Sequence, residues 1–204
     1  MSSTRLDRLA SFVDAVTQLH QQPVPLAEAD MVERASALLR GLIANDDWLP
    51  DSHAAPHPQY YQQHLLHADP LGRFSLVSFV WGPGQRTPVH DHTVWGIIGM
   101  LRGAEVGQRY GFGAEGRFGA IGTEHRLDPG QLDIVSPTVG DIHVVRNAYD
   151  DRVSVSVHLY GADIGKVRRH VYDSQTGAQK EFVSGYSAVA APVLAGISQG
   201  RVAR

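Results

Sequence analysis

Residues 87–92 read Thr-Pro-Val-His-Asp-His and follow a turn-forming Gly-Pro-Gly segment at residues 82–84. Side chains alternate along an extended strand, so His90 and His92 lie on one face and Asp91 lies on the other. Two imidazoles on one face can bind a single metal ion, with metal–nitrogen distances of about 2.0–2.2 Å. The segment therefore predicts a strand that carries part of a metal site.

The chain around this segment is typical of a mainly β fold. From Phe74 onward, short apolar runs rich in β-branched residues are interrupted by glycine or proline about every ten residues. These runs are FSLVSFVW, VWGIIGML, AEVGQRYGF, DIVS, DIHVV and RVSVSVHLY. Residues 171–186 add a hairpin pattern around Thr176–Gly177. Many short strands at regular spacing predict an antiparallel sandwich or barrel.

The N-terminal part has helical rather than strand periodicity. Apolar residues recur at steps of three and four in two stretches: Leu6, Leu9, Phe12, Val13, Val16 and Leu19, then Val32, Ala35, Leu38, Leu39, Leu42 and Ile43. Pro23 and Pro25 separate the two. We expect one domain over residues 1–204, with a mainly helical part at 1–70, a β-barrel at 71–186 and a C-terminal tail at 187–204, which we expect to be ordered only in part.

Composition excludes several classes of function. The 204 residues include no cysteine, so disulfides, thiolate metal sites and cysteine nucleophiles are excluded. The net charge of −3 argues against binding to nucleic acid or to an anionic membrane. The sequence shows neither a signal peptide nor an apolar run long enough to cross a membrane. We expect a soluble cytoplasmic protein that is a monomer or a weak homo-oligomer.

A third histidine completes the predicted metal site. His143 lies in Gly140-Asp141-Ile142-His143, a second strand context. Three histidines from two strands provide three nitrogen ligands and leave coordination positions open for substrate. The chain has 11 histidines. Five of the others are expected to be surface or capping groups: His53, His57, His64, His67 and His125.

The glycines around these histidines resemble the motifs of the cupin superfamily. Gly84, His90, His92 and Gly103 have the spacing of the first motif, and Pro137 to Asn147 resembles the second with one extra residue. Gly96 stands where that superfamily usually has a glutamate ligand. The resemblance implies a jelly-roll β-barrel. Three neutral imidazoles leave a divalent ion with its full charge, which favours a substrate that binds as an anion.

A second polar line follows residues 152–160. Val153, Val155, Val157 and Leu159 alternate with Ser154, Ser156, His158 and Tyr160. The polar face could lie in water, or it could line the barrel as a chain of hydrogen bonds from Ser156 through His158 to Tyr160. Periodicity alone does not decide between these interpretations.

Taken together, the motifs resemble the bacterial thiol dioxygenases of the cysteine dioxygenase family, and most of all the branch that acts on 3-mercaptopropionate. The resemblance runs from about Tyr60 to about Tyr186 and includes HDH, GDIH and the Ser-x-His-x-Tyr strand. It implies that His90, His92 and His143 bind ferrous iron, Fe(2+), and that Ser156, His158 and Tyr160 form a catalytic relay. It also implies that Arg169 binds the substrate carboxylate, and that Gln63, rather than Gln62, lines the pocket.

One difference between this sequence and the family's pattern bears on the identity of the substrate. Mammalian-type members carry a cysteine that cross-links to the tyrosine matching Tyr160, and an arginine near the position of Gln63. This chain has no cysteine and has glutamine there, which favours 3-mercaptopropionate over L-cysteine as the substrate. The implied reaction adds both atoms of O2 to the thiol sulfur and gives a sulfinic acid, without an organic cofactor. The alternatives are an L-cysteine dioxygenase proper, a metal-dependent cupin isomerase or hydrolase, and a cupin that serves as a small-molecule sensor.

Overall fold

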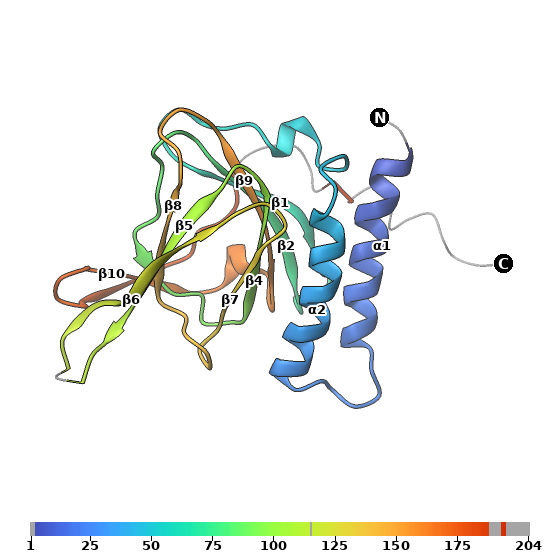
Figure 1. Cartoon of the computed structure of the whole chain (residues 1–204). Coiled ribbons are helices and arrows are strands. Elements are labelled where there is room, and N and C mark those ends of the chain that lie inside the picture. Colours follow the sequence, from blue (N-terminus) through green and yellow to red (C-terminus); the bar gives the residue numbers. More distant parts are fainter. Residues whose placement is uncertain (1–2, 115, 188–192, 195–204) are drawn as a thin grey trace.

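The computed structural model describes residues 3–114, 116–187 and 193–194, and its fold is mainly β with two N-terminal helices (Figure 1). This confirms the predicted fold class. Apart from Val193 and Leu194, the expected tail beyond residue 187 lies outside the described residues, and so does the side chain of Leu6. No helix in the described part of the chain is long and apolar enough to cross a membrane.

The two helices, α1 (Ser3–His20) and α2 (Glu28–Ile43), cover one face of a sheet (Figure 1). Among the described side chains of the predicted apolar stripes, Leu9, Val16, Ala35 and Leu39 are fully enclosed, and Leu19 and Leu38 are partly buried against the same core. The close approach of α2 to the sheet depends on Gly99, because a Cβ there would lie 3.0 Å from Ile43 Cδ1. The helices therefore close the outer side of the domain.

The strands form two antiparallel sheets. The five-stranded sheet contains, in spatial order, β1 (Gln62–Ala68), β2 (Ser75–Trp81), β9 (Ser154–Tyr160), β4 (Gly96–Arg102) and β7 (Leu132–Val135). The six-stranded sheet contains β11 (Gln179–Phe182), β10 (Arg169–Tyr172), β3 (Val89–His90), β8 (His143–Asn147), β5 (Glu105–Phe112) and β6 (Phe118–Leu127). Side chains from both sheets meet in two buried clusters, so the sheets pack face to face.

The expected boundary at residue 70 is too late. The second helix ends at Ile43, a short 3-10 helix follows at Asp51–His53, and the first strand begins at Gln62. The segment QQHLLHA lacks β-branched residues and shows no strand alternation. It is extended because its residues pair with β2 from Gln62 opposite Val80 to Ala68 opposite Ser75. Pairing with a neighbouring strand has overridden local propensity.

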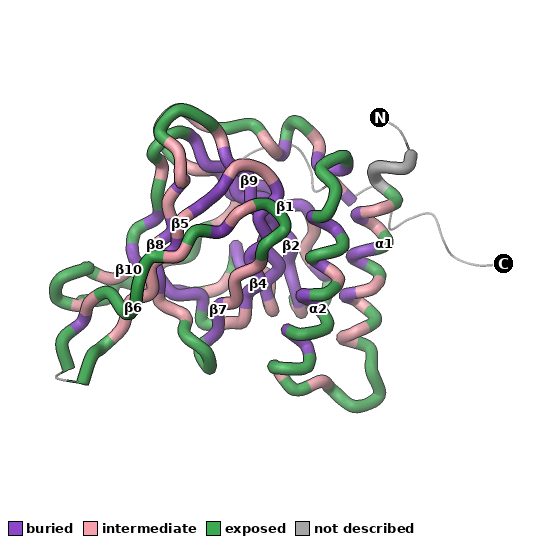
Figure 2. The backbone as a smooth tube through the Cα atoms, in the orientation of Figure 1, coloured by how far each residue is buried: buried purple, intermediate pink, exposed green. Residues whose placement is uncertain are grey.

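Strand β9 is the central strand of its sheet, and all of its residues are buried (Figure 2). Its apolar face, with Val155, Val157 and Leu159, belongs to the core beneath the helices. Its polar face therefore points toward the second sheet, between the two layers. Of the two interpretations left open by the alternation, the one that placed these polar side chains in water is wrong.

Candidate metal centre and substrate cavity

Three histidines from neighbouring strands meet in one buried cluster. His90 on β3 lies directly opposite His143 on β8, and His92 follows β3 after one residue. One ligand atom from each ring lies within 4.8 Å of the others, and the ring centroids are 4.8 to 4.9 Å apart. All three side chains are buried. The predicted triad is therefore assembled by the fold, with a spacing that suits one metal ion.

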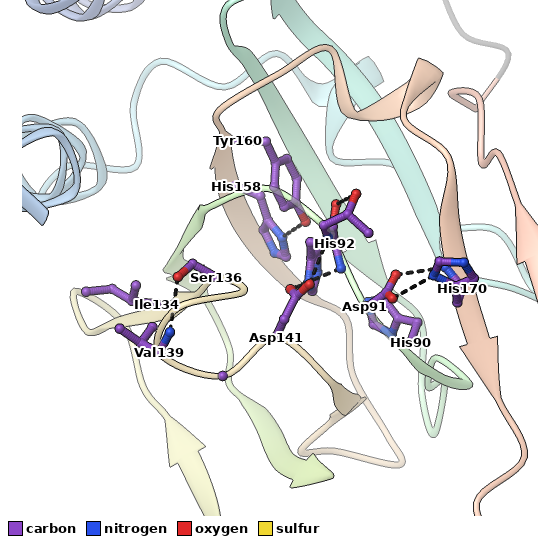
Figure 3. A network of polar contacts seen from close by, with 12 residues as sticks. His90, Asp91, His92, Ile134, Ser136, Val139, Asp141, His158, Tyr160 and His170 are labelled. Atoms are coloured by element: carbon purple, nitrogen blue, oxygen red, sulfur yellow. Dashed lines mark hydrogen bonds and ion pairs between the residues drawn. The ribbon is translucent and has the colours of Figure 1, made fainter. Parts of the chain in front are cut away.

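The orientation of two of the rings is set by hydrogen bonds at Nδ1. His90 Nδ1 lies 3.1 Å from the carbonyl oxygen of Pro88, and His92 Nδ1 lies 3.0 Å from Asp141 Oδ1. An Nδ1–H that donates in this way leaves the lone pair on Nε2 for a metal. Asp141 also accepts the backbone N–H groups of His92 and Thr93, which holds the carboxylate in place (Figure 3).

The electrostatics of the cluster favour neutral imidazoles. Burial lowers the pKa of His90 and of His143 well below the ordinary range, and positive charge on neighbouring imidazoles lowers each further. The Nδ1 of His143 is buried without a hydrogen-bond partner among the described residues. Neutral, partly unsatisfied imidazole nitrogens are the form in which histidine binds a metal. The donor set fits a divalent transition metal.

The position of the missing fourth ligand is occupied by a ring. A Cβ added at Gly96 would lie 2.8 Å from Tyr160 Cδ1 and 3.0 Å from Val135 Cγ2. No side chain fits there unless its neighbours move, because those contacts are shorter than van der Waals distance. The close packing of Tyr160 against β4 therefore explains why this centre has three histidines and no carboxylate.

The predicted relay is continuous. Ser156 Oγ lies 2.8 Å from His158 Nε2. His158 Nδ1 lies 2.8 Å from the Tyr160 hydroxyl (Figure 3). The Tyr160 ring stacks on His92 with centroids 5.6 Å apart, which places the tyrosine beside the triad. Phe79 stacks on His158 at 4.2 Å. Every member of the relay is buried, so its hydrogen bonds are shielded from water.

A cavity of about 260 Å³ opens beside the triad. Its lining residues are Tyr61, Gln63, Phe79, Thr87, Pro88, His90, Arg169, Val171, Phe182 and Ser184. Arg169 is buried, whereas its neighbour Arg168 is exposed and lies 3.5 Å from Glu181. Of the two glutamines, Gln63 lines the cavity, and Gln62 instead hydrogen-bonds the carbonyl groups of Tyr60 and Tyr61. The fold thus brings Arg169 and Gln63 together with one of the three histidines.

Within the cavity, Arg169 has unused hydrogen-bonding capacity. Its Nη2 donates to Ser184 Oγ at 2.7 Å, and its guanidinium lies over the Phe182 ring, 4.8 Å from the centroid. Its Nε is buried without a partner, and no carboxylate forms an ion pair with it within the described part of the chain. Gln63 Nε2 donates to the same Ser184 and to the Gly185 carbonyl. A buried guanidinium with a free N–H has the chemistry to bind an anion.

Comparison with known proteins identifies the family. The family model for cysteine dioxygenase type I matches residues 1–174 of the chain. The chain belongs to this family. Cysteine dioxygenase type 1 from Bos taurus is 25% identical over 186 residues, which cover 90% of this chain and 89% of the bovine protein. The Danio rerio protein of the same name is 25% identical over 182 residues, covering 87% of this chain and 86% of its own length.

Solved structures with part of this architecture include the TT1209 protein from Thermus thermophilus, with a TM-score of 0.43 and 21% identity over 55% of this chain and 92% of its own. A cupin superfamily protein from Desulfitobacterium hafniense has a TM-score of 0.43 and 13% identity, covering 58% of this chain and 94% of its own. The cysteine dioxygenase family membership makes this protein an enzyme, a thiol dioxygenase. The cluster of three histidines has the geometry to hold a metal ion.

The sequence pattern did not indicate every residue that supports this cysteine dioxygenase site. Asp141 holds His92, Ser184 holds both Arg169 and Gln63, and Glu105 is buried near Ser156. Asp141 stands in the same GDIH motif as His143, which was the signal available for it. Two expectations for other histidines were wrong: His53 and His64 are 4% and 2% exposed and lie against each other.

Changing Asp141 to alanine should weaken metal binding about 10- to 100-fold, because carboxylates that orient a metal-binding histidine contribute that much. Asp141→Asn keeps an oxygen that can accept the His92 Nδ1–H but loses the negative charge. Its metal affinity should therefore lie between those of Asp141→Ala and the parent. Metal titration monitored by competition with a chelator measures this order. The exposed Asp151→Asn is the control. Equal affinity for all four proteins would contradict the role of Asp141.

Proposed function

We propose that this thiol dioxygenase uses ferrous iron to oxidise a small carboxylate-bearing thiol, 3-mercaptopropionate in preference to L-cysteine, to the sulfinic acid. The observation that supports this most directly is the buried guanidinium of Arg169, whose Nε has no hydrogen-bond partner among the described residues, in the same cavity as His90. A substrate that places its sulfur near the histidines and its carboxylate at Arg169 matches both ends of that cavity. We further propose that the protein is cytoplasmic and is a monomer or a weak homo-oligomer.

His90, His92 and His143 would hold the iron. Three imidazoles suit ferrous iron as well as several other divalent metals, and no acidic ligand lies in the cluster that the structure describes. When bound, iron supplies a site for the thiolate and the redox chemistry by which O2 reacts. The protein's own part is to keep His90 and His143 neutral by burial, and to orient His90 and His92 through the contacts of Pro88 and Asp141.

Arg169 would bind the substrate carboxylate. Its free Nε and its Nη groups can meet a carboxylate with two parallel hydrogen bonds, which fixes the orientation of the ligand as well as its position. Ser184 and the Phe182 ring hold the guanidinium in place before substrate arrives. A carboxylate fixed in this way keeps the sulfur at the histidine end of the cavity and lowers the entropic barrier to reaction.

The preference for 3-mercaptopropionate follows from the charge of the cavity wall. Cysteine carries an ammonium group next to its carboxylate, and a buried ammonium needs an anionic or strongly accepting partner. Among the described lining residues, Arg169 is the charged group and no side chain is acidic. The ammonium of cysteine would therefore lie near a like charge without compensation, whereas 3-mercaptopropionate brings only the carboxylate.

Tyr160 would act as a hydrogen-bond donor to the reacting groups. Burial raises the pKa of its phenol above the ordinary value, so the hydroxyl keeps its proton at neutral pH. Burial also lowers the pKa of His158 well below its ordinary value, so the ring is neutral and carries one N–H. Ser156 and His158 then determine where the Tyr160 proton points.

Replacing Tyr160 with phenylalanine should lower kcat about 100-fold, the lower end of what a positioned proton donor contributes, and should leave KM for the thiol close to that of the parent. His158→Asn should also lower kcat, because the Tyr160 hydroxyl loses the imidazole nitrogen that lies 2.8 Å from it. Steady-state oxygen uptake measures both constants. Unchanged kcat in the two variants would contradict the relay.

The proposed function is tested by oxygen uptake of protein loaded anaerobically with ferrous iron, with 3-mercaptopropionate and L-cysteine offered separately and the product identified by mass. A higher kcat/KM for 3-mercaptopropionate, with its sulfinate as product, supports the proposal. A preference for L-cysteine would overturn the substrate assignment and favour the activity named for the bovine and zebrafish proteins. Absence of uptake with both thiols would contradict the proposed substrates and metal.

A further inference from the structure

A buried carboxylate connects the segment of the metal ligands to strand β10. Asp91 stands between two of the three histidines and is 5% exposed. Its Oδ1 accepts the backbone N–H of His170 at 2.7 Å, and its Oδ2 lies 2.8 Å from His170 Nδ1 (Figure 3). The Tyr172 hydroxyl donates to the same Oδ2 at 2.8 Å. These contacts satisfy a carboxylate that would be costly to bury without them.

The carboxylate of Asp91 acts where strand pairing ends. Strand β3 pairs with β10 at two positions, and the backbone N–H of Asp91 adds one further bond, to the carbonyl of His170 at 3.1 Å. The chain leaves the sheet directly afterwards, because the N–H of His92 donates to Asp141 and Thr93 has a φ of 58°. The side chain of Asp91 therefore accepts the N–H that a further strand carbonyl would otherwise accept.

Strand β10 begins with Arg169, the group proposed to bind the substrate carboxylate. The guanidinium is held from within its own hairpin, by the Phe182 ring on β11 and by Ser184 just after it. Strands β10 and β11 pair at four positions, and the order of the sheet places β10 between β11 and β3. The hairpin thus holds the guanidinium, and the contacts between β3 and β10 determine how far it lies from the histidines.

We propose that Asp91 is a positioning residue that sets the distance between the metal centre and Arg169, and so selects the length of the thiol acid that can reach both. The inference rests on the proposed function, since it requires a substrate with its sulfur at the histidines and its carboxylate at Arg169. Asp91 is not among the residues that line the cavity. It acts through His170, the neighbour of Arg169 in the chain.

A ligand that binds at both ends gains affinity from the fixed separation of the two sites. Once one end is bound, the other binds as if within one molecule, and the gain is largest when the ligand matches the separation. Loosening β10 from β3 should leave each site intact, because Pro88 and Asp141 orient two of the imidazoles and Ser184 holds the guanidinium. The advantage of binding both ends at once should be lost.

The test is calorimetric binding, in the absence of oxygen, of three ligands to protein loaded with ferrous iron. Propionate presents the carboxylate alone, 3-mercaptopropionamide presents the thiol alone, and 3-mercaptopropionate presents both. In Asp91→Ala the affinity for 3-mercaptopropionate should fall about 10- to 100-fold, because a small misplacement of a positioned group costs up to about that factor. The affinity for each of the two single-ended ligands should stay close to that of the parent.

Two further variants approach the same contact. Asp91→Asn keeps an oxygen for the His170 N–H, and its amide can donate to the His170 ring in the other tautomer. It should therefore recover much of the affinity for 3-mercaptopropionate that Asp91→Ala loses. His170→Ala removes the ring but keeps the backbone N–H, so it should show the same selective loss with a smaller size.

The matched control is Asp173→Ala, at the other end of the same strand. Asp173 is exposed and follows β10, and its Oδ1 accepts the N–H groups of Gln175 and Thr176 in the turn of the hairpin. The change disturbs the hairpin without removing a contact to Asp91. It should keep the affinity of the parent for all three ligands.

Turnover measures the predicted selection of length. Mercaptoacetate is one methylene shorter than 3-mercaptopropionate, and 4-mercaptobutyrate is one longer. In the parent, kcat/KM for 3-mercaptopropionate should exceed the values for both. In Asp91→Ala these ratios should fall toward one. In an Arg169→Ala background, Asp91→Ala should have no further effect on the ratios, because the carboxylate has already lost its partner.

The outcomes separate this inference from the proposed function. A parent that binds 3-mercaptopropionate no more tightly than propionate or the amide would overturn the proposed function, because the substrate would not bind at both ends. An Asp91→Ala protein that kept the advantage of the two-ended ligand would overturn the role of Asp91 alone. Equal weakening of all three ligands in both Asp91 variants would show a general role in folding and would overturn it too. Should Asp91→Ala fail to fold, Asp91→Asn and His170→Ala decide by the same comparison.

Discussion

Replacing His143 with alanine should remove bound iron and abolish thiol-dependent oxygen uptake. Residues that merely orient a ligand contribute about 10- to 100-fold to metal affinity, so loss of a ligand itself should lower affinity by more than about 100-fold. The structure gives a further reason. His143 lies opposite His90 on the adjacent strand, and the cluster contains three histidines. Removal of the His143 ring therefore leaves His90 and His92 without a third donor. Metal content after dialysis and steady-state oxygen uptake measure the two effects.

The control for this variant is His125→Ala. His125 lies on β6 of the same sheet and is partly exposed, and its ring pairs with Asp133 rather than with the triad. It should retain the iron content and the kcat of the parent. A His143→Ala protein that kept both would contradict the metal assignment, whereas equal losses in the two variants would mean that any change in this sheet disrupts the centre.

Replacing Arg169 with alanine should lower kcat/KM for 3-mercaptopropionate at least about 30-fold, mainly through a higher KM. Truncating one partner of a buried charge pair costs about 2–5 kcal/mol, and 2 kcal/mol corresponds to that factor. The loss should be confined to thiols that carry a carboxylate. With 3-mercaptopropionamide, which has the same length and no charge, the variant and the parent should differ by much less.

Two further variants sharpen this test. Arg168→Ala removes the same side chain from the adjacent position, where it is exposed and faces away from the cavity, and should leave KM unchanged. Arg169→Lys keeps the charge but loses the planar fork of donors, so KM should lie between the parent and the alanine variant. Equal losses for the acid and the amide in Arg169→Ala would show that the residue supports the cavity wall rather than the carboxylate.

Much of the site could be predicted from residue spacing because it lies on strands. Alternation places His90 and His92 on one face and Asp91 on the other, and the structure shows Asp91 bound instead to His170 (Figure 3). Asp91 also accepts a hydrogen bond from the Tyr172 hydroxyl. The same rule separates Arg169 from Arg168 and lines up the relay residues of β9. A period of two residues is a property of the extended backbone, so it can be read without knowing what the strand packs against.

It was harder to predict which face of a strand points into the core. The alternation on β9 was clear, but its polar face could equally have met water. It is buried because β9 is the central strand, with helices on one side and the second sheet on the other. The strand β1 was missed for the same reason, because its extended conformation comes from pairing with β2 and its own composition does not indicate it.

The sequence by itself therefore determined the mainly β class, the two helices and the shared face of His90 and His92, whereas Arg169 was chosen over its neighbour through the resemblance to a known family. The tertiary structure alone decided which residues from distant segments touch them: Asp141 lies against His92, and Tyr160 lies over Gly96. The physical reason is that periodicity is local to a strand. Contacts between sheets depend on register and on packing between strands far apart in the chain, which no local pattern encodes.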